Sequence, residues 1–351
     1  MGEKMLMKGN EAIGEAAIRA GCRFYFGYPI TPQSELTAYM AKKLLKMKDA
    51  AFVQAESEIA AINMVYGAAS TGARVMTSSS SPGISLKQEG ISYIACSEIP
   101  CVVVNMQRGG PGLGDIQPSQ ADYFQAVKGG GHGDYHLIVL APSSVQELVD
   151  LTMDAFDLAD KYTNPAMILG DGLMGQMMEA VEFKERPKVK LPDKSEWTLT
   201  GCKGREHRYI VSFDLDPNIL EKWNLDINEK YKKLKEKEVR YESVNIKNAD
   251  VVIVAYGTVA RIAKTTVQMA KKEGLNIGLI RPITLFPFPE KIIASTAEKT
   301  KKFLTVEMSL GQMVEDVKLA VNGKVEVNFY GRAGGIIPSP EEILKEAKKY
   351  L

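Results

Sequence analysis

The sequence predicts an α/β protein built largely on parallel β-sheet with helices on both faces. Short apolar runs rich in β-branched residues alternate with longer amphipathic segments, which is the pattern of strand–helix–strand units. This alternation lapses after about residue 183 and resumes near residue 249. A chain of 351 residues is long enough for two such domains and a connection. We therefore expect a first domain over residues 1–183, a connecting segment over 184–248 and a second domain over 249–351.

The first domain opens with two helices whose start signals are visible in the sequence. Asn10 is expected to cap a helix over residues 11–19, and Thr31, followed by Pro32, is expected to cap the next helix. The expected strands are residues 23–27, 51–54, 74–78, 101–105, 137–140 and 166–169. The further helices are expected near residues 56–71, 84–96, 118–127 and 143–161. Parallel sheets of this kind bind ligands at the carboxyl ends of their strands, so the chemistry is expected in the loops that follow them.

The connecting segment breaks the pattern because it contains Pro187, Pro192 and a highly charged run at 229–238. We interpret that run as a solvated helix in a connection that wraps a neighbour. The second domain then resumes the alternation. Its expected strands are residues 250–255, 277–281, 303–307 and 325–329. Its expected helices are residues 259–273, 290–297, 311–321 and 340–350.

Composition argues against several classes of partner. Lys and Arg number 44 against 43 Asp and Glu, so the net charge gives no reason to expect nucleic acid or an anionic membrane. The four cysteines are scattered without a C-x-x-C pair, so we expect free thiols and no iron–sulfur cluster or structural zinc held by this chain alone. The sequence shows neither an apolar leader nor a stretch of membrane-spanning length. We therefore expect a cytoplasmic protein without a membrane partner.

Glu58 is the first candidate for chemistry. It falls in the first turn of the expected helix near 56–71, among small residues such as Ala60, Ala61 and Gly67. An acidic residue suits the positive end of a helix dipole, which is the simpler explanation. Apolar walls also raise the proton affinity of a carboxyl group, and small residues let another body approach it. A ring nitrogen that needs a hydrogen-bonding carboxyl would suit this position.

Thr31 and Arg108 are the other candidates, each directly after an expected strand. Thr31 is either a plain helix cap or a contact for an anionic ligand at a helix start. Arg108 stands beside the glycine-rich run 109–114, where a ligand can approach closely. Its guanidinium would bind a carboxylate through two hydrogen bonds, although an arginine in a loop is commonly just solvated.

Two glycine motifs resemble cofactor sites but lack a required partner. Gly110-x-Gly112-x-Gly114 has no acidic residue at the end of the next strand to bind a ribose, so we reject nicotinamide binding there. Gly170-Asp171-Gly172 resembles the opening of the magnesium–diphosphate motif of thiamine diphosphate enzymes. That motif requires an asparagine about 25–30 residues later, and the stretch 195–201 has none.

Four motifs together resemble the alpha subunits of the 2-oxoacid:ferredoxin oxidoreductases, and the resemblance covers the chain from about residue 5 to its end. They are Gly27-Tyr28-Pro29-Ile30-Thr31-Pro32, Gln54-Ala55-Glu56-Ser57-Glu58-Ile59-Ala60-Ala61, Ser81-Pro82-Gly83-Ile84-Ser85-Leu86 and Gln107-Arg108-Gly109-Gly110-Pro111. Each motif is weak alone, but the set is highly specific. The resemblance implies a parallel-sheet domain of the type that binds the pyrimidine of thiamine diphosphate, followed by a transketolase C-terminal-like α/β domain.

The resemblance also implies which residues contact the cofactor. Glu58 matches the glutamate that activates the pyrimidine ring, since Gly67 follows nine residues later, a spacing seen across thiamine diphosphate enzymes. Glu56 is the alternative within the same motif. Pro29 would contact the cofactor from the first motif. Catalysis would thus depend on Glu58.

The implied reaction is the oxidative decarboxylation of a 2-oxoacid to an acyl-coenzyme A and carbon dioxide, with reduction of ferredoxin. Thr31 and Arg108 match the positions that hold the carboxylate and carbonyl of the 2-oxoacid. Thiamine diphosphate would be shared with a beta subunit that carries the Mg²⁺–diphosphate motif. Iron–sulfur clusters would lie on partner subunits, a gamma and a ferredoxin-like delta subunit among them, and the resulting hetero-oligomer would use coenzyme A.

The substrate is expected to be a branched-chain 2-oxoacid, 2-oxoisovalerate. The loop after Arg108 offers Asp115 and no second cation, so it would repel the distal carboxylate of 2-oxoglutarate if Asp115 faces the pocket. The run 112–125 also resembles the branched-chain branch of the family. His132 and His136 either line the substrate channel or fill a mobile loop.

Three alternatives remain open from the sequence. The chain would be a 2-oxoglutarate:ferredoxin oxidoreductase alpha subunit if the substrate were a dicarboxylate. It would be part of a non-redox thiamine diphosphate decarboxylase or transketolase-like enzyme if no electrons were passed on. It would be a silent binding protein if Glu58 had no chemical role.

Overall fold

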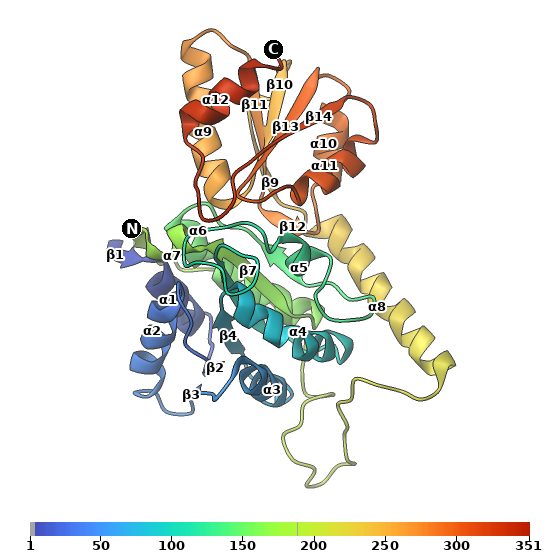
Figure 1. The fold of residues 1–351 in the computed structure, drawn as a ribbon. Coiled ribbons are helices and arrows are strands. Elements are labelled where there is room, and N and C mark those ends of the chain that lie inside the picture. Colours follow the sequence, from blue (N-terminus) through green and yellow to red (C-terminus); the bar gives the residue numbers. More distant parts are fainter. Residues whose placement is uncertain (1–3, 188) are drawn as a thin grey trace.

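The computed structural model describes residues 4–187 and 189–351, which form two α/β domains joined by a long connection (Figure 1). The first domain is built on a seven-stranded sheet in the order β12-β6-β7-β5-β4-β2-β3. Its strands are β2 (Phe24–Gly27), β3 (Ala51–Gln54), β4 (Val75–Ser79), β5 (Val102–Gln107), β6 (Ile138–Leu140), β7 (Ala166–Asp171) and β12 (Thr284–Phe286). Strands β2 to β7 pair in parallel, and β12 adds to β6 in the antiparallel sense.

Helices cover both faces of this sheet. They are α1 (Gly9–Arg19), α2 (Ser34–Leu44), α3 (Glu58–Ala69), α4 (Ser81–Cys96), α5 (Tyr123–Val127), α6 (Val145–Tyr162) and α7 (Gly172–Gln176). Helix α1 packs against α2 and α6, whereas α3 packs against α4. The step from β2 to β3 moves across the sheet in one direction, and the step from β3 to β4 moves in the other. Because both connections are right-handed crossovers, α2 and α3 lie on opposite faces. The expected parallel sheet with helices on both faces is confirmed.

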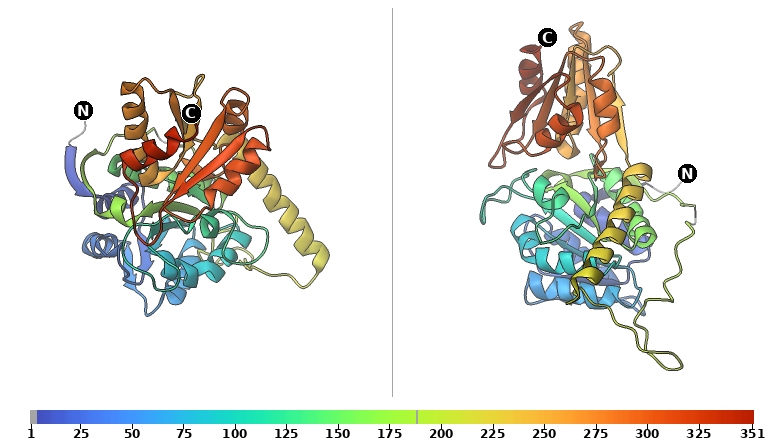
Figure 2. Two further views of the ribbon diagram at one scale, coloured as in Figure 1. Left: turned by 45° about the horizontal axis from the view of Figure 1, so that its top comes forward. Right: turned by 90° about the vertical axis from the view of Figure 1, so that its right-hand side faces the viewer.

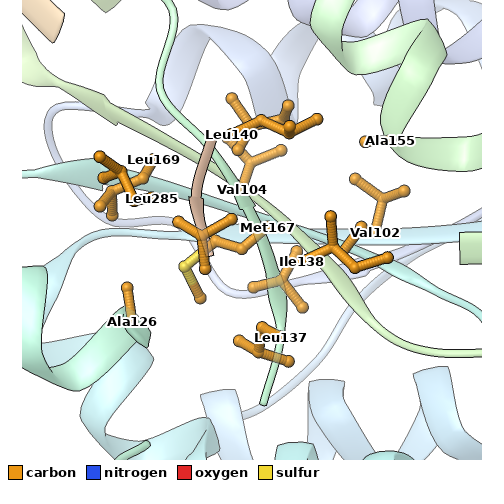
Figure 3. Close-up of a cluster of buried hydrophobic side chains, with 14 of the residues drawn as sticks. Val102, Val104, Ala126, Leu137, Ile138, Leu140, Ala155, Met167, Leu169 and Leu285 are labelled. Carbon is orange, nitrogen blue, oxygen red and sulfur yellow. The ribbon is translucent and has the colours of Figure 1, made fainter. Parts of the chain in front are cut away.

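The core of the first domain lies around its central strands. Strands β5 and β7 are buried along their whole length, as expected for parallel strands covered on both sides. Figure 3 shows Val102, Val104 and Met167 from these strands beside Leu140 of β6 and Leu285 of β12. Strand β12 comes from the part of the sequence expected to form the second domain. The two domains therefore share one hydrophobic core at this junction.

The connection begins with a small ribbon and ends in a long helix. Strand β1 (Lys4–Lys8) pairs antiparallel with β8 (Met178–Glu182), and an irregular segment then leads to α8 (Pro217–Lys237). Figure 2 shows α8 running along the first domain, and the irregular segment also contacts this domain, since Leu199 N donates to Ser70 O at 2.9 Å and Ser97 Oγ donates to Val211 O at 3.0 Å. Helix α8 is longer than the helix predicted from the charged run 229–238, and it buries Ile227, Tyr231 and Leu234. Within the chain, the connection thus packs against its own first domain.

The second domain is a five-stranded sheet in the order β14-β13-β10-β11-β9. Its strands are β9 (Tyr241–Val244), β10 (Val251–Val254), β11 (Ile277–Pro282), β13 (Lys302–Glu307) and β14 (Glu326–Gly331). Its helices are α9 (Gly257–Lys272), α10 (Glu290–Thr296), α11 (Met313–Val321) and α12 (Pro340–Lys348). All neighbouring strands are parallel except β9, which closes one edge in the antiparallel sense. Each strand and helix predicted for this domain is present within a few residues of its predicted ends.

Two of the predicted helix caps are wrong. Helix α1 begins at Gly9, and Asn10 lies inside its first turn, where its Nδ2 donates to Pro32 O at 2.8 Å. Helix α2 begins at Ser34 with Gln33 as its N-cap, because Gln33 N donates to Ile30 O at 3.1 Å and closes a turn around Thr31 and Pro32. Thr31 is therefore a turn residue before the helix. None of the helices in the described residues is long and apolar enough to cross a membrane.

Candidate functional site

Four loops meet at the carboxyl edge of the first sheet, where the sequence placed its candidates. Each directly follows one of the neighbouring strands β3, β2, β4 and β5. They carry Glu58 after β3, Thr31 after β2, the first turn of α4 after β4 and Arg108 after β5. Because parallel strands end at the same edge, residues far apart in sequence are brought close in space.

Glu58 is the first residue of α3 and is buried, with 6% of its surface exposed. Ser57 fixes the start of the helix, since its Oγ accepts a hydrogen bond from Ala60 N at 3.1 Å. The Glu58 carboxyl makes no hydrogen bond or ion pair with any residue that the structure describes. Glu56 is exposed and accepts a hydrogen bond from Ser57 Oγ at 2.9 Å. Of the two glutamates, Glu58 is the buried one without a partner.

Gly83, in the first turn of α4, lies directly against the Glu58 carboxyl. A Cβ atom at Gly83 would lie 2.6 Å from Glu58 Oε1 and 2.1 Å from Ser79 Oγ, so no larger residue fits here without displacing them. The hydroxyl groups of Ser79 and Ser80 are also buried, and neither finds a hydrogen-bond partner within residues 4–187 and 189–351. Buried polar atoms are ordinarily paired. A carboxyl and hydroxyls left unpaired at one place fit a polar ring such as the pyrimidine of thiamine diphosphate.

The Arg108 side chain is fixed by hydrogen bonds to two backbone carbonyls, one of them in the loop after β2. Its Nη1 donates to Thr31 O at 3.0 Å, and its Nη2 donates to Leu113 O at 2.8 Å. Its backbone N donates to Ser81 Oγ at 3.0 Å. The side chain is buried, and its Nε has no partner among the described atoms. The alternative of a solvated arginine is therefore wrong, and Arg108 and Thr31 are in direct contact.

Asp122 is a site residue that sequence reasoning did not single out. Its Oδ2 accepts hydrogen bonds from Ser81 Oγ at 2.6 Å and from Asn105 Nδ2 at 2.9 Å. Burial raises the pKa of Asp122, and these two hydrogen bonds act to lower it. It stands in an irregular segment before α5, and no local pattern marks it. Only the contact with Ser81 and the loop of Arg108 identifies it.

A pocket of about 370 Å³ opens between the two domains beside Arg108. The first domain contributes Ser81, Arg108 and Asp122, and the second contributes Ser309 and Gln312. Ser85 and Ser119 add two further hydroxyl groups, and the other wall residues are apolar or glycine: Pro82, Gly110, Pro111, Gly112, Ala121, Met308, Leu310, Ala333 and Gly334. Of the four predicted site residues, all within the described part of the chain, Arg108 alone lines this pocket. Thr31 and Pro29 lie in the exposed turn after β2.

Asp115 and the motif Gly170-Asp171-Gly172 have local structural roles. The Asp115 side chain is exposed and accepts a hydrogen bond from Gln117 N at 2.8 Å, and it is absent from the pocket wall. The buried Asp171 caps α7 by accepting from Leu173 N and Met174 N, each at 3.0 Å. No group of three or more side chains that could hold a metal ion is found among the described residues.

His136 belongs to the junction between the domains. Its ring stacks on Phe286 of β12 at 4.1 Å between centroids, and its backbone N donates to Tyr231 Oη of α8 at 3.0 Å. Burial lowers the pKa of His136. His136 thus packs between β12 and α8, whereas His132 is exposed in the loop after α5.

Comparisons with known proteins give a consistent assignment. Residues 15–238 match the family described as pyruvate flavodoxin/ferredoxin oxidoreductase, thiamine diphosphate-binding, and residues 249–343 match pyruvate:ferredoxin oxidoreductase core domain II. The chain is 52% identical to a ketoisovalerate oxidoreductase subunit of Methanothermobacter marburgensis, over 98% of this chain and 97% of that one. It is 37% identical to a 2-oxoglutarate synthase subunit of Methanothermobacter thermautotrophicus, over 98% of each chain.

A solved structure resembles the whole fold. It is the 2-oxoglutarate:ferredoxin oxidoreductase of Magnetococcus marinus with 2-oxoglutarate, coenzyme A and succinyl-coenzyme A bound. The TM-score is 0.86 at 27% identity, and the alignment covers 99% of this chain and 65% of that one. The expected pairing of a thiamine diphosphate-binding domain with a second α/β domain is thereby confirmed. The chain belongs to the family of 2-oxoacid:ferredoxin oxidoreductase subunits that carry a thiamine diphosphate-binding domain.

Proposed function

We propose that this chain is the alpha subunit of an enzyme that oxidatively decarboxylates a branched-chain 2-oxoacid, 2-oxoisovalerate, to an acyl-coenzyme A. The products would include carbon dioxide and reduced ferredoxin. The 52% identity to a ketoisovalerate oxidoreductase subunit, against 37% to a 2-oxoglutarate synthase subunit, supports this substrate over the dicarboxylate. The apolar walls of the pocket beside Arg108, with Met308, Leu310 and Pro82, suit a branched aliphatic side chain.

The observation that carries the proposal is the buried Glu58 carboxyl without a partner. Thiamine diphosphate, when bound, supplies the carbanion chemistry that decarboxylation of a 2-oxoacid requires. Glu58 would hydrogen-bond the ring nitrogen of its pyrimidine, and Pro29 would contact the ring from the turn after β2. Only 6% of the Glu58 surface is exposed, so few water molecules compete for that hydrogen bond. Glu58 would thus hold or accept a proton at the pyrimidine nitrogen.

Arg108 and Thr31 would bind the carboxylate and carbonyl of the 2-oxoacid. A guanidinium has five N–H donors, and Arg108 uses two of them on the carbonyls of Thr31 and Leu113. Three donors therefore remain, on a side chain that lines the pocket. The two carbonyl contacts fix the plane of the guanidinium before substrate arrives, which lowers the entropy lost on binding.

Partner subunits complete the proposed enzyme. The beta subunit would supply the Mg²⁺–diphosphate site, and the gamma and ferredoxin-like delta subunits would carry iron–sulfur clusters towards ferredoxin. Helix α3 supports a partner on this side, because Ile59 is 50% and Met64 38% exposed next to Gly67, which has open space around it. Exposed apolar side chains on a surface helix are found at interfaces.

The test is to reconstitute the complex and measure reduction of ferredoxin or a viologen dye with 2-oxoisovalerate, pyruvate and 2-oxoglutarate. We expect the highest kcat/KM with 2-oxoisovalerate. Glu58→Gln should lower the activity by about two orders of magnitude or more, as expected for loss of an acid–base group. Glu56→Gln is the matched control, because this neighbour is exposed, and it should retain activity. A preference for 2-oxoglutarate would contradict the proposed substrate, and a fully active Glu58→Gln enzyme would contradict the proposed role of Glu58.

A further inference from the structure

Lys87 is a fully buried lysine behind Glu58 that the proposed reaction leaves without a role. It lies on α4, none of its surface is exposed, and its Nζ donates to Thr77 Oγ1 at 3.0 Å. That hydroxyl is neutral, and the ammonium group makes no ion pair in the part of the chain that the structure describes. Lysine is almost never fully buried unless its charge is compensated. A cation kept in the core without a direct counter-ion therefore calls for an explanation.

The geometry directs this cation towards Glu58. Lys87 lies one helical turn after Gly83, and helix side chains point back towards the N-terminus, so its stem runs towards the Gly83 turn. Gly83 is the residue against the Glu58 carboxyl. Thr77, which holds Nζ, and Ser79, beside Glu58, share one face of β4 two residues apart. The ammonium and the carboxyl therefore lie along the same strand face, within about 10 Å of each other.

Strand β4 and helix α4 contribute few other charges near Lys87 and Glu58. Strand β4 has no ionisable residue. On α4 the remaining ionisable residues are Glu89, Tyr93 and Cys96. Glu89 and Tyr93 hydrogen-bond to each other at 2.7 Å in a solvent-exposed pair, and Cys96 is the last residue of the helix. Burial lowers the pKa of Lys87 to about 8 from an ordinary 10.5, and the Glu58 charge acts to raise it. Near neutral pH the lysine is still mainly protonated.

We propose that Lys87 is a positioning residue for the reaction, a buried cation whose charge stabilises negative charge on the Glu58 carboxyl. An ionised carboxylate accepts a hydrogen bond from a protonated ring nitrogen, whereas a neutral carboxyl surrounded by apolar walls does so poorly. A lysine at this position costs stability, since an apolar side chain of similar length would avoid desolvating a charge. The inference rests on the proposed function, because it assigns Lys87 a task that only the role of Glu58 requires.

The test follows proton removal from bound thiamine diphosphate in the assembled complex without any 2-oxoacid. Exchange of the thiazolium C2 proton in D₂O is measured by NMR after acid quench, across a range of pH. We expect Lys87→Met to slow exchange about tenfold or more. We also expect the pH profile of exchange to move to higher pH, because the buried ammonium no longer stabilises negative charge at Glu58. The urea midpoint of the variant should be equal to or above that of the wild type.

Lys230→Met is the matched control. Lys230, on α8, is another largely buried lysine. Its Nζ lies 3.0 Å from Glu98 Oε1, and burial lowers the pKa of Lys230 too. Its removal should affect the urea midpoint and leave the exchange rate and its pH dependence unchanged. Lys87→Gln keeps a donor for Thr77 without the charge and should reproduce the exchange defect if the methionine variant is poorly folded. If neither variant assembled, the lysine would be required for folding and the inference would be wrong.

The outcomes separate the two proposals. Slow exchange in Glu58→Gln with normal exchange and normal pH dependence in Lys87→Met would overturn the role of Lys87 and leave that of Glu58 intact. Normal exchange in Glu58→Gln would overturn the proposed function. If Lys87 acts through Glu58, adding Lys87→Met to the Glu58→Gln variant should slow exchange no further. An additional defect equal to that of Lys87→Met alone would contradict the inference.

Discussion

At the scale of single residues, the structure distinguishes side chains that look alike in the sequence. Glu56 and Glu58 stand two residues apart, but one is exposed and the other is buried against Gly83. Arg108 lies in a glycine-rich loop, where an arginine is commonly solvated, yet two backbone carbonyls hold its guanidinium. In both cases the deciding fact is the position of a second loop, and the sequence near the residue carries no signal for it.

Arg108→Lys should weaken substrate binding although it keeps the charge. A lysine has no planar fork and cannot contact Thr31 O and Leu113 O while presenting further donors to a carboxylate. We expect KM for 2-oxoisovalerate to rise about 10- to 100-fold, in line with losing one or two charge-assisted hydrogen bonds. Steady-state kinetics of the reconstituted complex measure this. Arg261→Lys, at a surface ion pair with Glu179, is the control, and equal KM values for the two variants would refute the role of Arg108.

At the scale of elements, periodicity predicted most strands and helices, and the errors are shifted ends, misplaced caps and missed short strands. Helix α9 was predicted as residues 259–273 and spans Gly257–Lys272. The caps at Asn10 and Thr31 were wrong because both residues have tertiary partners that compete with capping: Asn10 bonds to Pro32 O, and Thr31 O accepts from Arg108. The short edge strands β1, β8, β9 and β12 were not predicted. Strands of three to five residues at an edge bury too little to leave a clear apolar pattern.

Ser57→Ala should test how α3 positions Glu58. Loss of the Ser57 Oγ contact with Ala60 N should cost about 1 kcal/mol of stability. Ser339→Ala removes the corresponding cap of α12, far along the chain, and should cost a similar amount. Urea unfolding of each variant measures the cost. Isothermal titration of the complex with thiamine diphosphate should then show weaker binding only for Ser57→Ala, and equal affinities would indicate that the cap does not orient Glu58.

At the scale of the whole molecule, the two domains are joined through a shared core and a charge cluster around the buried Arg281. Strand β12 extends the first sheet, so the second domain cannot separate without breaking β-sheet hydrogen bonds. Arg281 of β11 is fully buried, and its Nη atoms contact Glu147 of α6 at 2.6 and 2.8 Å. Its Nε lies 3.0 Å from Glu242 Oε2. The pocket beside Arg108 depends on this arrangement because both domains line it.

The Glu147–Arg281 contact should make stability fall in acid. Burial acts to raise the pKa of Glu147, but its bonds to Arg281 and Ser143 outweigh this and lower the pKa below the ordinary 4.5. A carboxyl with a lowered folded-state pKa contributes stability that is complete above its unfolded value. This contribution is lost as the pH falls through the folded value. Glu147→Gln should therefore cost about 2 kcal/mol at pH 7, less than the ~3–5 of a fully buried pair because solvent reaches Glu147.

Urea unfolding from pH 7 to pH 3 measures this dependence. The gap between wild type and Glu147→Gln should be largest at pH 7 and shrink below about pH 4.5 as the wild-type carboxylate becomes protonated. Glu206→Gln is the control, since Glu206 is exposed, and its curve should follow that of the wild type. A gap that stays constant down to pH 3 would show that Glu147 contributes through packing and not through its charge.

The sequence by itself determined the fold class, the order of most elements and the family, because each depends on local periodicity and on motifs that are contiguous in the chain. It also led to Glu58 and Arg108, since both directly follow strands whose carboxyl ends share an edge. Only the tertiary structure decided that Arg108 contacts Thr31, that Asp122 accepts a hydrogen bond from Ser81 and that the buried Lys87 bonds to Thr77. The first two contacts join residues far apart in the sequence, 77 positions in the case of Arg108 and Thr31, and depend on which strands are neighbours. Sheet order is set by the burial of whole faces, a free energy summed over the molecule that no short stretch of sequence records.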